Sequence, residues 1–112
     1  MPVPATELRI VLTTVGSREE AEPIARHLVD ERLAACVNIV PGLTSIYRWK
    51  GDVETASEVL LLIKTSVASL DHLEGTLRRL HSYEIPEFLV LSPESCGKTY
   101  LSWLLLESTP RR

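Results

Sequence analysis

Several signatures of common protein classes are missing from this 112-residue chain. There are two cysteines, which is too few for a disulfide framework. Basic residues number 12 against 15 acidic ones, so there is no positive footprint for nucleic acid. No apolar run approaches the roughly 20 residues that a membrane-spanning helix needs. The first residues, MPVPATE, lack the basic stretch and apolar core of a secretory signal. These absences predict a cytoplasmic protein with neither a nucleic acid nor a membrane as its partner.

The composition that remains is that of an ordinary soluble domain. Hydrophobic residues make up 45% of the chain and charged residues 24%. A chain of this length is expected to form one domain over residues 1–112, with its own hydrophobic core. Flexible ends are expected at residues 1–6 and 108–112.

The spacing of apolar residues predicts alternating strands and helices. Helices are expected from Ser17 to about residue 29, then over 70–80 and 99–107, and strands over 8–15, 35–40, 44–50, 58–65 and 88–91. The order β-α-β-β-α-β-α predicts an α+β, ferredoxin-like fold (a split β-α-β pair plus a C-terminal helix) with an antiparallel sheet.

Local signals refine this outline. Ser17 followed by Glu20 is typical of a capping box, and Pro23 predicts a kink or an irregular first turn in the first helix. The Pro41-Gly42 pair predicts a bulge, and the polar stretch 51–56 predicts the connection of an antiparallel hairpin. Residues 95–97 are expected to form a loop.

The stretch LAACVNIVPGLTSIYRWKG, residues 33–51, is more apolar than one small domain can easily hide. Tyr47 and Trp49 lie near its end, and aromatic side chains are enriched at the centres of protein interfaces. We therefore expect Trp49 to lie at a contact between subunits.

Four segments resemble the CutA family of divalent-cation tolerance proteins in order and spacing. They are residues 33–51, LLLIKT at 60–65, the H-x-Y-x-x-P-E pattern at 81–87, and YLSWL at 100–104. The resemblance implies a ferredoxin-like homotrimer whose long hairpins pair across subunits. It also implies a non-enzymatic role in tolerance of divalent metal ions.

The resemblance further implies copper as the ion, and His81 with Glu87 as the remaining candidate ligands. Imidazole and carboxylate groups are competent ligands for such cations. Thr13 stands where related proteins carry a cysteine, and Leu80 where they carry a first histidine. The alternative is structural: His81 caps the end of a helix and Glu87 is a solvated charge.

A second candidate site is a polar pocket near the subunit contacts, formed by Trp49, Glu58, Lys64 and Tyr83, with Tyr47 beside them. Glu58 and Lys64 are separated by an even number of residues, so they share one face of their strand. A purely structural ion pair is the alternative for these two residues. The fold and trimer also resemble the PII signalling proteins, which suggests a small anionic metabolite with Lys64 as its counter-ion.

The two cysteines are expected to differ. Cys36 lies between Ala35 and Val37 and is expected in the core, where a free thiol behaves as a small hydrophobe. Cys96 is expected to be exposed in its loop. No pattern typical of hydrolases or transferases stands out.

Overall fold

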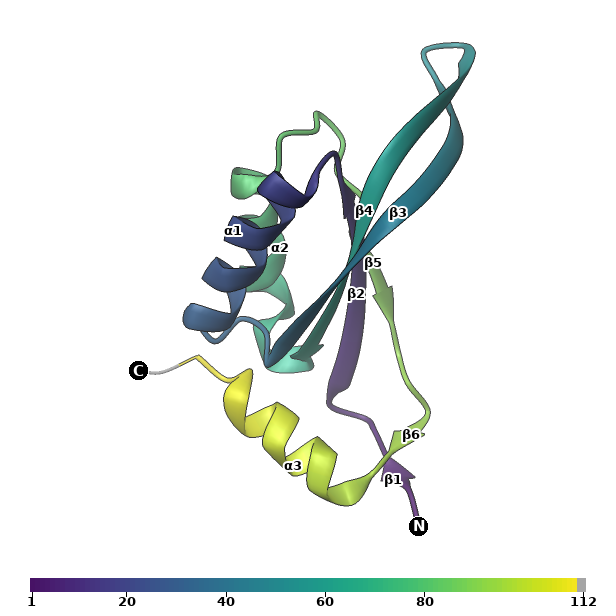
Figure 1. Ribbon diagram of the computed structural model, residues 1–112. Coiled ribbons are helices and arrows are strands. Elements are labelled where there is room, and N and C mark those ends of the chain that lie inside the picture. The colour runs from purple at the N-terminus through teal and green to yellow at the C-terminus, as the bar shows by residue number, and fades with distance from the viewer. Residues whose placement is uncertain (111–112) are drawn as a thin grey trace.

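The computed structural model describes residues 1–110 and has the predicted α+β, ferredoxin-like fold (Figure 1). A four-stranded antiparallel sheet has the strand order β3-β4-β2-β5. The elements are β1 (Val3–Pro4), β2 (Leu8–Val15), α1 (Arg18–Asp30), β3 (Cys36–Trp49), β4 (Asp52–Ser66), the 3-10 turn η1 (Val67–Ser69), α2 (Leu70–Leu80), β5 (Leu89–Leu91), β6 (Ser95–Cys96) and α3 (Lys98–Glu107).

Helices α1 and α2 cover one face of the sheet and enclose the main core (Figure 1). The sheet residues in this core have odd numbers, as the two-residue period of a strand requires. Its fully buried members include Val11, Val15, Leu61 and Ile63 from the sheet, and Leu28, Leu73 and Leu77 from the helices.

Helix α1 begins as predicted, because the Ser17 side chain accepts a hydrogen bond from the backbone N–H of Glu20 at 3.2 Å. The helix continues through Pro23 without a break. The second half of the predicted capping box is wrong, since the Glu20 side chain bonds to a distant loop instead.

The opposite face of the sheet is only partly covered. Helix α3 packs across its lower end in a second, smaller core of Leu8, Ala35 and Leu104. Among residues 1–110, no helix other than α3 covers this face, and we call it the open face.

Strands β3 and β4 extend past the body of the domain as a long hairpin (Figure 1). Its turn is Lys50-Gly51, whose φ angles of 51° and 88° are both positive, as a tight two-residue turn of this hand requires. The prediction of a connection over residues 51–56 was therefore wrong in length. Polar residues 52–56 pair with β3, because the cross-strand hydrogen bonds outweigh their weak strand preference.

Both ends of the chain make contacts that the sequence pattern does not reveal. Val3 and Pro4, in the segment predicted to be flexible, pair with Ser95 and Cys96, so the first two residues of the predicted loop at 95–97 form a short strand instead. Ser108 is fully buried, and its carbonyl oxygen accepts a hydrogen bond from the Ser66 hydroxyl at 3.0 Å. Residues 111–112 of the predicted flexible tail lie outside the described residues.

Within residues 1–110, no helix combines the length and apolar character needed to cross a membrane.

Two buried threonines on the helix-covered face differ in hydrogen bonding. The Thr65 hydroxyl donates to the carbonyl oxygen of Leu33 at 2.7 Å. The Thr13 hydroxyl, also fully buried, has no hydrogen-bond partner among the described residues. An unsatisfied buried hydroxyl is destabilising, so the Thr13 side chain lowers the free energy of unfolding.

The same substitution at these two positions is expected to have opposite effects. Thr13→Val should stabilise the fold by about 1 kcal/mol, because it removes an unsatisfied polar group without changing the side-chain shape. Thr65→Val should destabilise it by about 1–2 kcal/mol, because it deprives the Leu33 carbonyl of its donor. Urea unfolding of the two variants measures both values, and shifts of the same sign would contradict the assignment.

Candidate functional site

A cavity of about 540 Å³ lies on the open face, where the hairpin leaves the body of the sheet. Its wall contains three aromatic and three acidic side chains. The lining residues are Tyr47, Trp49 and Tyr83; Glu58, Glu84 and Glu87; and Thr14, Ser45, Ser82 and Ile85.

The bulge at Pro41-Gly42 decides which side chains of β3 reach this cavity. Before it, even-numbered residues of β3 oppose even-numbered residues of β4, as in the pair of Val40 and Leu60. After it, odd-numbered residues take that place, as in the pair of Tyr47 and Glu54. One extra residue in a strand moves all later side chains to the other face. The bulge thus brings Tyr47 and Trp49 to the same side as Thr14 and Glu58.

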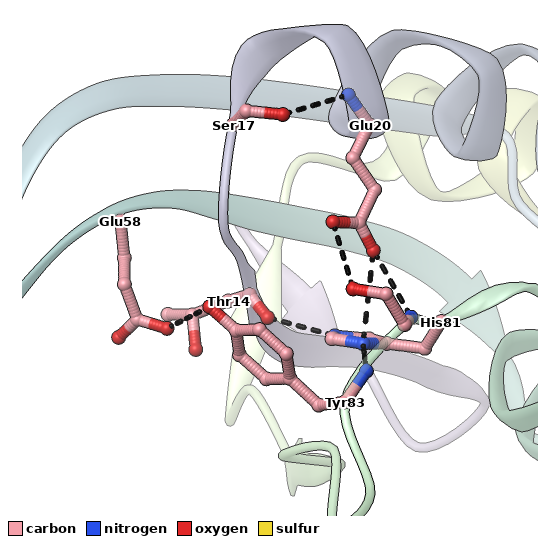
Figure 2. Close-up of polar contacts among 7 residues, drawn as sticks. Thr14, Ser17, Glu20, Glu58, His81 and Tyr83 are labelled. Carbon is pink, nitrogen blue, oxygen red and sulfur yellow. Dashed lines mark hydrogen bonds and ion pairs between the residues drawn. The ribbon is translucent and has the colours of Figure 1, made fainter.

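Tyr83 joins the cavity to the sheet (Figure 2). Its hydroxyl donates a hydrogen bond to Glu58 Oε2 at 2.7 Å. Burial, this hydrogen bond and the charge of Glu58 together raise the pKa of Tyr83 well above its usual value. The hydroxyl therefore remains protonated and keeps donating throughout the physiological pH range.

His81 is buried behind Tyr83 rather than in the cavity (Figure 2). Its Nε2 lies 2.8 Å from the carbonyl oxygen of Thr14, and its Nδ1 lies 3.1 Å from the backbone nitrogen of Tyr83. Because Tyr83 N–H can only donate, Nδ1 accepts, and Nε2–H donates to Thr14. Neither ring nitrogen has a free lone pair for a metal ion.

The expected copper ligands therefore do not form a centre in one chain. His81 is already fully engaged by its two hydrogen bonds. Glu87 lines the cavity, which His81 does not. Throughout residues 1–110, no group of three or more histidine, cysteine or acidic side chains is arranged to hold a metal ion. The structural alternative for His81 has support too, since its backbone N–H caps α2 by bonding to the carbonyl of Leu77.

Glu20 fixes the loop that carries Tyr83 (Figure 2). Its carboxylate accepts hydrogen bonds from the backbone N–H and the hydroxyl of Ser82, at 3.1 and 3.0 Å. Glu20 Oε2 also lies 3.9 Å from His81 Nδ1. The first turn of α1 thus anchors the loop after α2, a role for which the sequence carries no signal besides the predicted cap.

Within one chain, Lys64 does not line this cavity. It shares the open face with Glu58, but six residues along a strand correspond to roughly 20 Å. Lys64 pairs with Ile10 and Cys36 near the C-terminal end of β4, whereas Glu58 lies at the middle of this strand. Of the lining residues that the structure describes, none is basic. The structure therefore offers no support for an anionic metabolite held by Lys64.

Five other predicted residues lie together. Trp49, Tyr47, Glu58, Tyr83 and Glu87 are brought together around the cavity. The prediction omitted four polar residues of the lining, Thr14, Ser45, Ser82 and Glu84.

The cysteines also differ from expectation. Cys36 was predicted to be buried, but it is partly exposed on the open face, with its sulfur 3.8 Å from Asn38 Oδ1. Cys96 is likewise partly buried, because it packs against the second core instead of lying in an exposed loop.

Two carboxylates of the cavity repel each other. Burial, and secondarily the negative charge of Glu58, raise the pKa of Glu87 above its usual range. The ionised form of Glu87 is therefore disfavoured in the folded protein.

These observations define the class of the protein: a ferredoxin-like α+β domain with an acidic, aromatic cavity beside a long hairpin. The family described as CutA1 divalent ion tolerance protein matches residues 9–107. This chain belongs to the CutA1 family.

Individual relatives agree with this assignment. The divalent-cation tolerance protein CutA of Thermus thermophilus is 52% identical over 95 residues, which cover 85% of this chain and 92% of that protein. The chloroplastic protein CutA of Arabidopsis thaliana is 43% identical over 85% of this chain, but this match spans only 52% of the plant protein. The solved structure of CutA from Synechococcus elongatus has a TM-score of 0.92 at 38% identity, covering 97% of this chain and 96% of that one.

Removing the charge of Glu87 is expected to stabilise the protein. Because the pKa of Glu87 is raised in the fold, the penalty is absent at low pH and grows as the pH rises through the folded-state pKa. Glu87→Gln should raise Tm at pH 7 by on the order of 1 °C, a small effect because the group is exposed, and the gain should shrink toward pH 4. Thermal unfolding at both pH values, with Glu94→Gln as an exposed control, tests this; a lower Tm at pH 7 would refute it.

Proposed function

We propose that this chain acts in the cytoplasm as a non-enzymatic homotrimer that contributes to tolerance of divalent cations, copper among them. Membership of the CutA1 divalent ion tolerance family carries the proposal. Location varies among relatives, since the Arabidopsis protein is chloroplastic and an Archaeoglobus fulgidus protein is described as periplasmic.

The open face supports the trimer. Leu62, Leu12 and Leu89 are cross-strand partners, so they form one apolar row across three strands. Leu89 is 51% exposed, and Leu91 on the same strand is 42% exposed. A sheet face this apolar is normally buried against another layer, and residues 1–110 provide none beyond α3. In the proposed trimer, further copies of the chain cover this face.

The hairpin supports it further. Ile46 is 71% exposed and Val53 is 63% exposed. Ile46 pairs with Thr55, and Val53 pairs with Arg48, toward the tip of the hairpin that projects from the body of the domain (Figure 1). Pairing of hairpins between copies would bury these side chains.

The oligomeric state is the first test. Light scattering at low micromolar concentration is expected to give about three times the 12.5 kDa monomer mass. Leu89→Glu should lower this mass by placing a charge in the apolar contact, whereas Val29→Glu, an exposed position on α1, should leave it unchanged. A wild-type mass of 12.5 kDa would refute the trimer.

Copper tolerance is tested by growth. A bacterial strain lacking its own CutA-family protein is expected to survive raised copper better with this chain than with an empty vector. His81→Gln should protect equally well, since both imidazole nitrogens are occupied and glutamine can still donate a hydrogen bond to Thr14. Equal survival with and without the chain contradicts the tolerance role. Loss of protection by a folded His81→Gln variant would instead restore His81 as a metal ligand.

A further inference from the structure

Arg32 occupies a backbone position that glycine usually fills. Its φ angle is 59°, in the left-handed region that is unfavourable for residues with a Cβ. Helix α1 ends there, since the N–H of Arg32 bonds to the carbonyl oxygen of Val29. The next N–H, of Leu33, bonds to the carbonyl oxygen of Leu28. These two bonds form a Schellman motif, in which the left-handed residue is most often glycine. An arginine strains the backbone at this position, so its side chain is expected to contribute elsewhere.

The Arg32 guanidinium binds the end of a different helix, α3. Its Nε donates to the carbonyl oxygen of Thr109 at 3.1 Å, and its Nη2 donates to that of Leu106. Its Nη1 lies 3.5 Å from Glu107 Oε1. Carbonyl groups in the last turn of a helix have no partner within the helix, and a cation is favoured at that end. One side chain thus meets three groups at the C-terminal end of α3.

Buried hydroxyl groups hold the same end of α3. Ser66, the last residue of β4, donates to the carbonyl oxygen of Ser108 at 3.0 Å, and Ser69 of η1 donates to the same oxygen. All three serines are buried. Arg32, Ser66 and Ser69 therefore bind the end of α3 from three different parts of the chain. We call these three residues the latch.

The apolar residues of α3 do not by themselves determine how this helix docks. It carries large apolar side chains on both its inner and its outer side. The inner ones, which belong to the second core, are Leu101, Leu104 and Leu105. The outer ones, which are exposed, are Tyr100, Trp103 and Leu106. Burial of apolar area alone therefore does not select one rotation of α3 about its axis, because the helix has no single apolar stripe. The latch selects one, since it binds the helix end in one orientation.

Helix α3 is also separate from the main core. That core is built from the sheet and from α1 and α2, whereas α3 packs into the second, smaller core. Among the ten described residues of α3, Leu104 alone is buried. Segments with few buried contacts open at a lower free energy than the whole domain unfolds. Opening of α3 therefore need not disturb the main core.

We propose that α3 is a strap and that Arg32 is the main part of the latch that holds it shut. Breaking the latch lets α3 separate from the sheet as a unit, which uncovers Leu8 and Ala35 of the second core while the main core stays folded. The proposed further copies of the chain cover the same face of the sheet, so the latch sets how much of that face is available to them. The strap itself requires neither the trimer nor a role in metal tolerance.

Hydrogen–deuterium exchange of the full chain, resolved by residue, tests the strap in the unmodified protein. The amides of Leu104 and Leu105 are expected to exchange at least roughly tenfold faster than those of Val11 and Leu61, because local opening requires less free energy than global unfolding. Leu104 and Val11 are both fully buried, so a difference between them does not reflect exposure in the closed state. Equal rates in α3 and in the main core would overturn the proposal.

Arg32→Gly tests the latch, because it removes the guanidinium and suits the left-handed backbone. Loss of the charge-assisted hydrogen bonds should speed exchange in α3 roughly tenfold. Exchange in the main core should rise by less than about threefold. The strained backbone persists when only α3 opens, so relieving it opposes global unfolding alone and offsets part of the loss there.

Two further variants serve as controls. Arg32→Lys keeps the charge but lacks the planar fork of donors, so exchange in α3 should lie between that of the unmodified protein and that of Arg32→Gly. Arg26→Ala removes the same charge from an exposed position of α1 and should change exchange in α3 by less than about twofold. The latch is refuted by unchanged exchange of α3 in Arg32→Gly, by equal acceleration of α3 and the main core in that variant, or by equal acceleration of α3 in Arg26→Ala.

Discussion

The extra residue at Pro41-Gly42 is the constraint on which the site depends. It changes the face that β3 presents without ending the strand. Below it, β3 adds Val37 and Ile39 to the core under the helices. Above it, the same strand directs Tyr47 and Trp49 to the open side. A regular strand would place these aromatic side chains on the opposite side of the hairpin, away from Glu58 and Thr14. One local irregularity thus lets a single strand serve both the core and the cavity.

A network of hydrogen bonds then holds the opposite wall in place. Glu20 binds Ser82, His81 joins the end of β2 to Tyr83, and Tyr83 reaches Glu58. These contacts connect α1, β2, β4 and the loop after α2, which are distant in sequence (Figure 2). His81 is central because its two nitrogens play different roles, one donating and the other accepting. A residue that resembles a metal ligand in the sequence is therefore a structural connector in the fold.

Periodicity predicted most of the fold because its elements are long and regularly amphipathic. Residues 8–15 and 70–80 form the expected strand and helix, and the bulge lies where Pro41-Gly42 suggested. The site was harder to predict because it depends on position along a strand as well as on its face. Lys64 shares a strand face with Glu58, as the even spacing predicts, yet within one chain it lies nearer the C-terminal end of β4 and outside the cavity. Pairing of the first residues with Ser95 and Cys96 leaves no periodic trace, since each strand has two residues.

The acidic cavity retains a conflict that folding alone does not explain. Glu58 is buried without a cation, and its charge disfavours ionisation of nearby Glu87. Neither carboxylate charge stabilises the isolated domain, since glutamine in place of Glu58 or Glu87 would avoid the repulsion between them. A group such as Glu87, whose raised pKa opposes stability, is typical of functional sites. The acidic cavity is therefore best understood as an arrangement that serves the function of the protein at some cost to the stability of the isolated domain.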